Sequence, residues 1–503
     1  MSQGRPDQHR SAPAALTGRI ASGPSRLLHE EVLEPQFARE ARHLAPWYVA
    51  IEKVLALEYL RMGLLSEEQA RTVGRLLDTA EKGIVADPDA NMSDIAFAIE
   101  RHVEAGLDAP LPAWHVDRSR NDLQSCAQLA FSRDSLIGVA ERLLDFCDAV
   151  LAPAADLRHA PMPGHTHFQA AQIMTPGFYL AAVAGEVLHT VRRLLATYDG
   201  IDNCPLGSGA MVGQDLPWDR DRMARLLGFR TAQPHALTGV AARNWTAEIT
   251  AELSLFGTVA SRFVTDLMTW GSSEYGFVDL PDELSGISSA MPQKKNFPVL
   301  ERIRGRTAHL SGCHVDVLLG QRNTPYTNLV EVSKEAGAPL YAAFDHARSL
   351  LRLFTAVVQH LTFREDRMRA ACEREYLGGF SLANRLTLDE NVPWRQAQVL
   401  AGRYITAALE AGRAPRDIDA DLLRAAADGL GHRLKDPERI LAESFDVGRS
   451  LEKRTSGSVH PEAVAALLAD HATERARLAG ECRTRRETTA GALARTNHEL
   501  GIG

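Results

Sequence analysis

The amino-acid sequence predicts an all-α, three-lobed protein with a central bundle of long helices. Apolar residues recur at helical spacing over long stretches, alternating strand-like patterns are scarce, and glycine, proline and serine gather in the connections. With 503 residues, 45% of them hydrophobic, the chain has ample material for a large core. We expect a disordered N-terminal arm at 1–25, an N-terminal helical domain at 26–115, a central long-helix bundle domain at 116–362 and a small C-terminal helical domain at 363–503.

The first long helix of the central domain has the clearest pattern in the chain. Helices near 36–62 and 66–85 are expected before it. Leu129, Leu136, Leu143 and Val150 then recur at every seventh position, which places them along one side of a helix. No proline- or glycine-rich break follows, so we expect one long helix from about 121 to 151.

Three more stretches of the central domain predict long helices. Thr175 and Pro176 form an N-cap and first-turn pair at the start of 175–199. Residues 244–275 and 340–361 repeat apolar residues three, four or seven positions apart. Long amphipathic helices with short connections form a bundle. In the C-terminal domain glycine and proline interrupt the pattern more often, so the helices there are expected to be short.

Composition and charge exclude several classes of protein. The formal net charge is -8 and the basic residues are dispersed, so nucleic acid is not an expected partner. No apolar run approaches the roughly 20 residues of a membrane span, and the start of the chain is polar, so we expect a cytoplasmic protein without a membrane partner. The six cysteines are far apart and contain no C-x-x-C pair. Neither a metal site nor a disulfide framework is therefore expected.

The long helices also raise the question of what covers their outer faces. A single chain would struggle to bury two faces of each helix. We therefore expect helices from several subunits to pack together.

A polar loop, S-G-I-S-S-A-M-P-Q-K-K-N, stands at 285–296, immediately before a helix. It offers a proton acceptor, Ser288 or Ser289, beside Lys294 and Asn296, which suit a substrate carboxylate. On composition alone, a mobile surface loop with a lysine pair explains the same residues.

The segment D-R-S-R-N-D at 117–122 begins the first long helix. Its two arginines and its asparagine form a candidate clamp for a dicarboxylate, because guanidinium binds carboxylate in a bidentate manner and a helix N-terminus adds positive potential. An N-cap flanked by surface salt bridges is the alternative interpretation.

Two connections between helices carry further segments. In P-G-H-T-H-F-Q-A-A-Q at 163–172, His167 is suited to proton transfer near neutral pH, although His165 and His167 equally fit polar loop side chains. The second, P-L-G-S-G-A-M-V-G at 205–213, lacks the glycine spacing of a dinucleotide site and no strand is expected before it, so we expect no cofactor there.

Taken together, these segments resemble one protein family. The loop at 285–296 resembles the signature G-S-S-x-M-P-x-K-x-N of the fumarase, aspartase and argininosuccinate lyase superfamily, and its Q-K-K-N ending is similar to the argininosuccinate lyase branch. The other three segments resemble G-R-S-R-N-D, P-G-Y-T-H-L-Q-x-A-Q and P-L-G-S-G-A-L-A-G of that branch, in the same order. Tyr326 and Lys334 stand as in its Y-N-x-D-L-Q-E-x-K stretch.

The resemblance implies a role for each matching residue. Ser288, by its register with Lys294, is the implied base, Lys294 stabilises negative charge, and His167 has an acid or electrostatic role. Glu301, at the start of the helix after the loop, would pair with His167. Contacts with substrate are implied for Arg118, Ser119, Arg120, Asn121, Thr166, Gln169, Arg220, Ser289, Asn296, Tyr326, Glu331 and Lys334.

The resemblance also implies an activity and an assembly. The expected reaction is the β-elimination of an N-substituted aspartate, argininosuccinate or a related N-succinyl amine, to fumarate and an amine, as in arginine biosynthesis. No cofactor or metal is implied. A homotetramer is expected, in which each active site combines loops from three subunits.

Several departures from the family pattern leave alternatives open. Asp117 and Ile287 stand where the family has glycine, and Glu331 stands where it has glutamine. We expect these changes on the amine side of the site, so the natural amine can differ from arginine. Another fumarate-releasing lyase of the superfamily and a catalytically inactive structural homologue are the alternatives. The joint presence of Ser288, Lys294 and His167 argues against the inactive protein.

Overall fold

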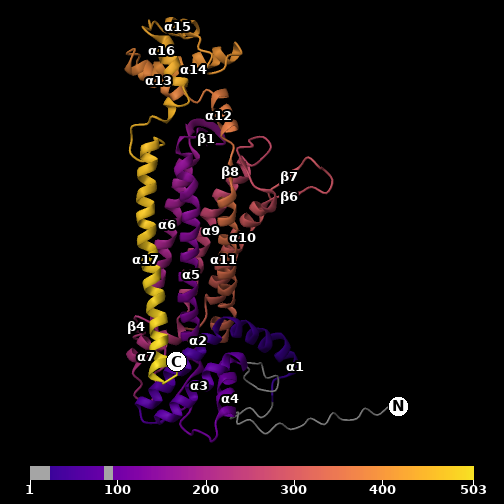
Figure 1. The fold of residues 1–503 in the computed structure, drawn as a ribbon, viewed down its shortest axis with the longest axis vertical. Helices are drawn as coiled ribbons and strands as arrows, with labels where there is room; N and C mark the ends of the chain where they lie inside the picture. The colour runs from indigo at the N-terminus through magenta and orange to yellow at the C-terminus, as the bar shows by residue number, and fades with distance from the viewer. Residues whose placement is uncertain (1–22, 84–93, 503) are drawn as a thin grey trace, which may run out of the picture.

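Long helices run side by side through the middle of the computed structural model (Figure 1). The structure describes residues 23–83 and 94–502. The central bundle contains α5 (Arg120–Asp156), α6 (Pro176–Ile201), α9 (Asn244–Trp270), α10 (Pro298–Gln321) and α11 (Ala338–His360). Helix α5 packs against α6 and α11, and α10 packs against both α9 and α11. The prediction of an all-α protein with a bundle of long helices is confirmed.

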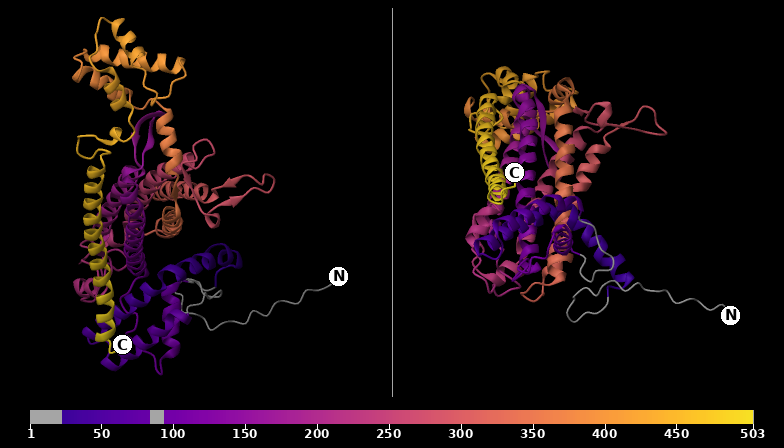
Figure 2. Two further views of the ribbon diagram at one scale, coloured as in Figure 1. Left: turned by 45° about the horizontal axis from the view of Figure 1, so that its top comes forward. Right: turned by 60° about the horizontal axis from the view of Figure 1, so that its bottom comes forward.

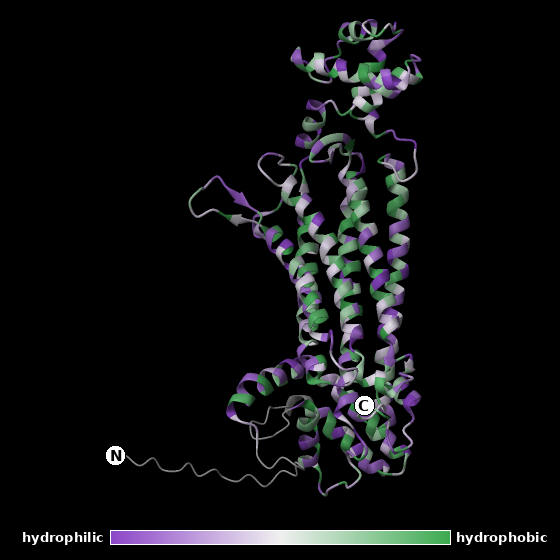
Figure 3. Ribbon diagram, turned by 180° about the vertical axis from the view of Figure 1, so that it is seen from behind, coloured by the Kyte–Doolittle hydropathy of each residue, from purple (hydrophilic) through white to green (hydrophobic). Residues whose placement is uncertain are grey.

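Local sequence explains where these helices begin and which face they bury. The Ser119 hydroxyl accepts the Asn121 amide at the start of α5, and the Thr175 hydroxyl accepts the Phe178 amide at 3.0 Å at the start of α6. The side of α5 that carries an apolar residue at every seventh position is buried, with Leu143 and Val150 both at 0% exposure. Hydrophobic and hydrophilic residues alternate along the long helices in the view from behind (Figure 3).

The N-terminal lobe lies at one end of the bundle (Figure 1). It contains α1 (Arg26–Leu28), a π-helix η1 (His29–Leu33), α2 (Glu34–Arg61), α3 (Glu67–Gly83) and α4 (Ile95–Gly106). The helices expected near 36–62 and 66–85 correspond to α2 and α3. The expected disordered arm at 1–25 lies outside the described residues except for its last three.

Short strands occur only within the connections of the described chain. They are β1 (Met162–Thr166), β2 (Gln169–Met174), β3 (Asn203–Cys204), β4 (Thr231–Ala232), β5 (Val278–Asp279), β6 (Gly286–Ile287), β7 (Lys295–Asn296) and β8 (Thr362–Phe363). β3 pairs with β4 in parallel, and β1 with β2, β5 with β8 and β6 with β7 are antiparallel. Short helical turns complete the connections: η2 (Leu157–His159), α7 (Arg220–Leu226), α8 (Ala236–Ala241), η3 (Asp282–Leu284) and η4 (Glu331–Glu335).

A second hydrophobic core lies at the opposite end of the bundle (Figure 1). Its buried residues, which include Leu382, Leu400, Tyr404, Leu423 and Ile440, form a cluster separate from the main core. The elements of this region are α12 (Glu365–Arg374), α13 (Gly379–Leu388), α14 (Trp394–Glu410), α15 (Ala420–Asp428), α16 (Pro437–Phe445) and η5 (Arg449–Leu451).

The last helix, α17 (Pro461–Glu499), returns along the bundle and packs against α5 and α6 (Figure 1). The sequence predicts that this stretch belongs to the small C-terminal domain, 363–503. The structure instead places Leu478 and Cys482 in the main core, because these side chains face the bundle.

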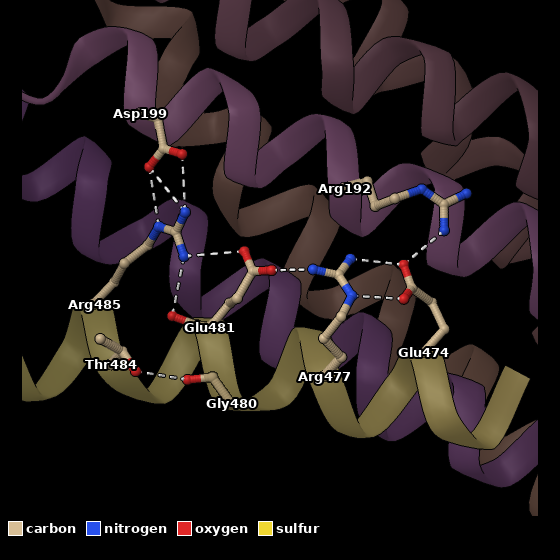
Figure 4. A network of polar contacts seen from close by, with 8 residues as sticks. All are labelled: Arg192, Asp199, Glu474, Arg477, Gly480, Glu481, Thr484 and Arg485. Atoms are coloured by element: carbon tan, nitrogen blue, oxygen red, sulfur yellow. Dashed lines mark hydrogen bonds and ion pairs between the residues drawn. The ribbon is translucent and has the colours of Figure 1, made fainter.

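Ion pairs add to the contact between α17 and α6 (Figure 4). Arg485 donates to both carboxylate oxygens of Asp199 at 2.9 Å, and Arg192 pairs with Glu474 at 3.0 Å. A bidentate guanidinium contact is more directional than a single surface ion pair. Within the described residues, no helix has both the length and the apolar character needed to cross a membrane.

Candidate active site

A β-hairpin at the end of the bundle presents His167. Thr166 pairs with Gln169, so the turn consists of His167 and Phe168 alone, and both have positive φ, 54° and 59°. Two-residue turns with this geometry match the twist of the strands, although residues with a side chain adopt it at a cost. The tight turn leaves His167 exposed, together with Thr166 and Gln169.

His165 and His167 line a cavity of about 360 Å³ between the hairpin and helices α6 and α9. Tyr179, Trp270 and Tyr275 form much of its wall, and Asp266 is its carboxylate. The Tyr179 hydroxyl donates to Asp266 at 2.7 Å, and Asp266 forms no ion pair within the described chain. A negative, aromatic cavity of this kind suits a cationic amine.

Sequence analysis missed Asp266 and its aromatic neighbours. Residues 244–275 were interpreted only as an amphipathic helix. The acidic side chain stands one position before the buried Leu267, and nothing in the local pattern distinguishes it from an ordinary exposed residue. Only the packing of the hairpin against α6 and α9 places it beside His165.

A second group of candidate residues lies on an arm that projects from the bundle, formed by β6, β7 and the loop between them (Figure 2). In this loop the Ser288 hydroxyl accepts the backbone amide of Met291 at 3.0 Å and that of Ala290 at 3.4 Å. Amide donors stabilise negative charge on an oxygen, so they favour the alkoxide that a serine base requires. Ser289 is exposed.

The two lysines of the arm have different surroundings. Lys295 lies 3.2 Å from carboxylate oxygens of both Asp279 and Asp282, and although partial burial lowers its pKa, these contacts raise the pKa overall. Lys294 is exposed and forms no ion pair with the described residues. Lys295 therefore anchors the arm, whereas Lys294 is free to bind a carboxylate. The Asn296 side-chain amide donates to the Ile287 backbone carbonyl at 3.4 Å.

A third group gathers at the start of α5, at the opposite end of this helix from the hairpin. The buried Asp122 carboxylate accepts the amides of Gly207 and Gly209 at 2.9 and 3.0 Å. Gly209 has φ of 62°, and a Cβ there would lie 2.4 Å from the Gly213 carbonyl. The Asn121 side-chain amide donates to the Ala210 backbone carbonyl at 3.1 Å. The structure thus joins 117–122 to the glycine-rich segment at 205–213.

The arginines near this group are largely engaged within the chain. Arg118 is buried and pairs with Glu52, and Arg220 donates to the Ser208 hydroxyl at 3.1 Å. The Arg120 side chain is 47% exposed and pairs with Asp94 at 2.6 Å. Among these arginines, Arg120 has the substantially exposed side chain. Fewer arginines are therefore accessible to a dicarboxylate than the sequence predicts.

The remaining candidates lie on and before η4. Tyr326 and Glu331 are exposed. Lys334 forms an ion pair with the buried Glu40 of α2. This contact attaches η4 to the N-terminal lobe.

A single chain does not bring the candidate residues into one site. Helix α5 has 37 residues, which corresponds to about 55 Å at 1.5 Å per residue. Arg120 is the first residue of this helix and His167 follows its end, so the two groups lie at opposite ends. Glu301 is exposed in the first turn of α10 and forms no ion pair with His167 within the described chain.

Comparisons with known proteins agree with this architecture. A family model described as Lyase matches residues 70–312. Argininosuccinate lyase of Methanothermobacter thermautotrophicus is 31% identical over 406 residues, which cover 80% of this chain and 86% of that protein. Argininosuccinate lyase 1 of Shouchella clausii is 26% identical over 446 residues, 88% of this chain and 89% of that protein.

Solved structures show the same fold. The crystal structure of EDDS lyase in complex with formate superimposes with a TM-score of 0.83 at 24% identity and covers 95% of both chains. Class II fumarase from Schistosoma mansoni superimposes with a TM-score of 0.65 at 14% identity, over 82% of this chain and 94% of that chain.

The helical bundle and the segments attached to it define a carbon–nitrogen lyase. More narrowly, the chain belongs to the argininosuccinate lyase family.

Proposed function

We propose that this protein catalyses the β-elimination of an N-substituted aspartate, argininosuccinate or a related N-succinyl amine, to fumarate and a free amine. The family relationship supports the reaction type. The observation that carries the proposal is the loop of the arm, where two backbone amides donate to the Ser288 hydroxyl and Lys294 has no ion-pair partner among the described residues.

In the proposed mechanism Ser288 removes a proton from the carbon beside the distal carboxylate of the aspartyl group. The negative charge that develops on this carboxylate is stabilised by Lys294 and Asn296. The carbon–nitrogen bond then breaks, its electron pair leaves with the nitrogen, and a carbon–carbon double bond forms in fumarate. His167 is proposed either to donate the proton that the leaving nitrogen takes up or to favour the departure of the amine electrostatically.

We further propose that the complete site forms between subunits of a homotetramer. The position of His167 and of the residues at the start of α5 at opposite ends of this helix supports this, because the reaction needs the base, the carboxylate contacts and His167 around one small substrate. In this arrangement Glu301 of one subunit orients His167 of another. Further substrate contacts come from the opposite end of the bundle of a third subunit, from Arg120, Asn121, Tyr326, Glu331 and Lys334.

The cavity with Asp266 supports a cationic leaving amine. The Asp266 carboxylate lacks an ion-pair partner within the described chain, and the rings of Phe168, Tyr179, Trp270 and Tyr275 line the same cavity. Arginine satisfies this chemistry, as do other amines with a second positive charge. Argininosuccinate is therefore the first substrate to test, and related N-succinyl diamines are the second class.

The test is an assay of purified protein with argininosuccinate and a panel of N-substituted aspartates, in which fumarate is followed by its ultraviolet absorbance. Ser288→Ala should reduce turnover by about 10²- to 10⁴-fold, the contribution of a positioned base. Ser289→Ala is the matched control, since its exposed hydroxyl lacks the two amide contacts, and it should lose much less. Near wild-type turnover in a folded Ser288→Ala protein would contradict the assignment. If the wild-type protein forms no fumarate from any substrate of the panel, the result would favour the interpretation as an inactive structural homologue.

A further inference from the structure

A buried arginine without a counter-ion lies at the start of α9. Arg243 is 3% exposed, and its Nη1 donates to the backbone carbonyls of Val240 at 2.8 Å and Ala242 at 3.1 Å. Its Nε and Nη2 are also buried, and neither has a hydrogen-bond partner among the described residues. No described carboxylate forms an ion pair with it. A buried cation is costly unless it is paired, so this guanidinium lacks an expected partner.

Another buried arginine of the bundle shows how such a charge is usually compensated. Arg133 is also 3% exposed, but it lies 3.0 Å from the Asp202 carboxylate and donates to the Tyr198 hydroxyl at 2.8 Å. The Asp202 carboxylate therefore compensates the guanidinium of Arg133, whereas no described carboxylate compensates that of Arg243. Burial without a partner lowers the pKa of Arg243 to about 10.

Arg243 borders a small cavity that is also bordered by Gln128, whose acceptor Oε1 has no hydrogen-bond partner among the described residues. Trp245, 7% exposed, also borders it, and its indole Nε1 has no hydrogen-bond partner among the described residues. The cavity lies at the N-terminus of the 27-residue helix α9, where the helix dipole adds positive potential. Its volume is about 10 Å³, enough for one particle the size of a water molecule.

We propose that this cavity binds one monatomic anion of the halide class, chloride in solution. The Arg243 guanidinium supplies charge and the donors Nε and Nη2, and Trp245 supplies a third donor. A neutral water would fit the volume but would leave the charge uncompensated. The cavity is too small for a phosphate or a dicarboxylate, so this site is separate from the binding of substrate.

The bound anion would connect elements that carry candidate substrate contacts. The cavity is bordered by Gln128 of α5 and by Ser333 of η4, and the Gln128 amide donates to the Ser333 carbonyl at 2.9 Å. Glu331 and Lys334 belong to the same short helix. Occupancy of the site should therefore stabilise the position of η4 as well as the protein as a whole.

The experiment compares thermal unfolding of the full-length protein in sodium chloride or sodium bromide with unfolding in sodium gluconate at equal ionic strength. A ligand that binds only the native state raises the Tm as its concentration rises. We expect a halide-dependent rise in Tm for the wild type and none for Arg243→Met. Arg133→Met is the matched control: it should be less stable than the wild type but keep the halide response. Equal Tm values in halide and gluconate for the wild type, or an unchanged halide response in Arg243→Met, would overturn the proposal.

A milder variant and a direct probe cover the case in which Arg243→Met does not fold. Trp245→Phe keeps the aromatic ring but removes one donor, so it should weaken halide affinity roughly tenfold. In crystals grown with sodium bromide, anomalous scattering should reveal one bromide beside Arg243. A cavity without anomalous signal at high bromide occupancy elsewhere in the crystal would contradict the site. Hydrogen exchange across 328–337 should slow when halide replaces gluconate.

Discussion

Two carboxylates lie in surroundings that change their ordinary behaviour. Asp122 is 1% exposed, and burial raises its pKa to about 7, although the amides of Gly207 and Gly209 offset part of this effect. Asp266 instead borders a cavity and accepts the Tyr179 hydroxyl; burial and the neighbouring carboxylate raise the pKa of Tyr179. The first carboxylate has a structural role, whereas the second is placed to meet a ligand.

Asp122 makes a prediction about pH and stability. Because its pKa is higher in the folded protein than the ordinary value of 3.8, the native state retains a proton that the unfolded state releases between pH 3.8 and about 7. This group therefore favours folding at low pH, and its contribution falls as pH rises through that window. Asp122→Asn should lack this part of the slope. Chemical denaturation at several pH values, compared between the two proteins, measures the difference, and parallel curves would contradict the prediction.

Asp266 makes a prediction about the amine. Asp266→Asn removes the negative charge while keeping the shape, so KM for the amine in the reverse reaction should rise by about 10- to 100-fold, the worth of one charge-assisted hydrogen bond. KM for fumarate in the same assay should change little and serves as the internal control. A parallel rise in both constants would indicate a general disturbance of the site.

Among the structural elements, the start of α5 is held to residues 215–218 by the side chain of Asp117. Asp117 has φ of 55°, a conformation that asparagine and aspartate adopt more readily than most residues. Its carboxylate accepts the Leu216 amide at 2.8 Å, the Trp218 indole at 2.9 Å and the Asp215 amide at 3.2 Å. Burial raises its pKa, but these hydrogen bonds outweigh burial and lower the pKa overall. Asp117 thus combines a left-handed backbone conformation with three hydrogen bonds to the neighbouring segment.

Two substitutions separate these contributions. Asp117→Gly keeps the left-handed backbone without strain but loses the three hydrogen bonds, whereas Asp117→Ala loses both advantages. We expect both variants to be less stable than the wild type, and the alanine variant to be less stable than the glycine variant by about 1 kcal/mol. Urea denaturation measures the order. An alanine variant at least as stable as the glycine variant would show that the backbone conformation is not strained.

At the scale of the whole molecule, the outer face of α10 is the surface that suggests assembly. Val315, Leu318 and Leu319 are 52%, 46% and 58% exposed, and side chains added at Gly305 and Gly312 would meet open space. Exposed apolar residues on a long helix, with glycines that allow close approach, favour packing against helices of other subunits. This surface supports the proposed tetramer, which a mass measurement in solution tests directly.

Shared active sites predict that two inactive variants restore activity together. In mixed tetramers of Ser288→Ala and His167→Ala subunits, some sites receive an intact arm from one subunit and an intact hairpin from another. Random mixing gives roughly a quarter of the wild-type sites. Ser288→Ala mixed with Lys294→Ala is the control, because both changes lie on one arm and no intact arm remains. If the first mixture stays inactive in verified mixed tetramers, the base and the histidine do not come from different subunits.

Local sequence determined much of this protein. Helical periodicity predicted the bundle, Ser119 and Thr175 predicted where α5 and α6 begin, and the ordered polar segments predicted the family. These features depend on interactions between residues close in the chain, which the sequence records directly. The same is true of the arm, whose serine and lysines stand within one short loop.

Tertiary structure alone decided which distant residues meet. The packing of separate helices produces the return of α17 along α5 and α6, the cavity that joins Asp266 to the hairpin, and the burial of Arg243 beside Trp245 without a described carboxylate. Packing also determined which charges form ion pairs. Arg118 pairs with Glu52 and Lys295 pairs with Asp279, whereas Lys294 forms no ion pair with the described residues. An arginine or an aspartate has the same letter whether it is paired, buried or free, and its chemistry is set by neighbours that only the folded chain supplies.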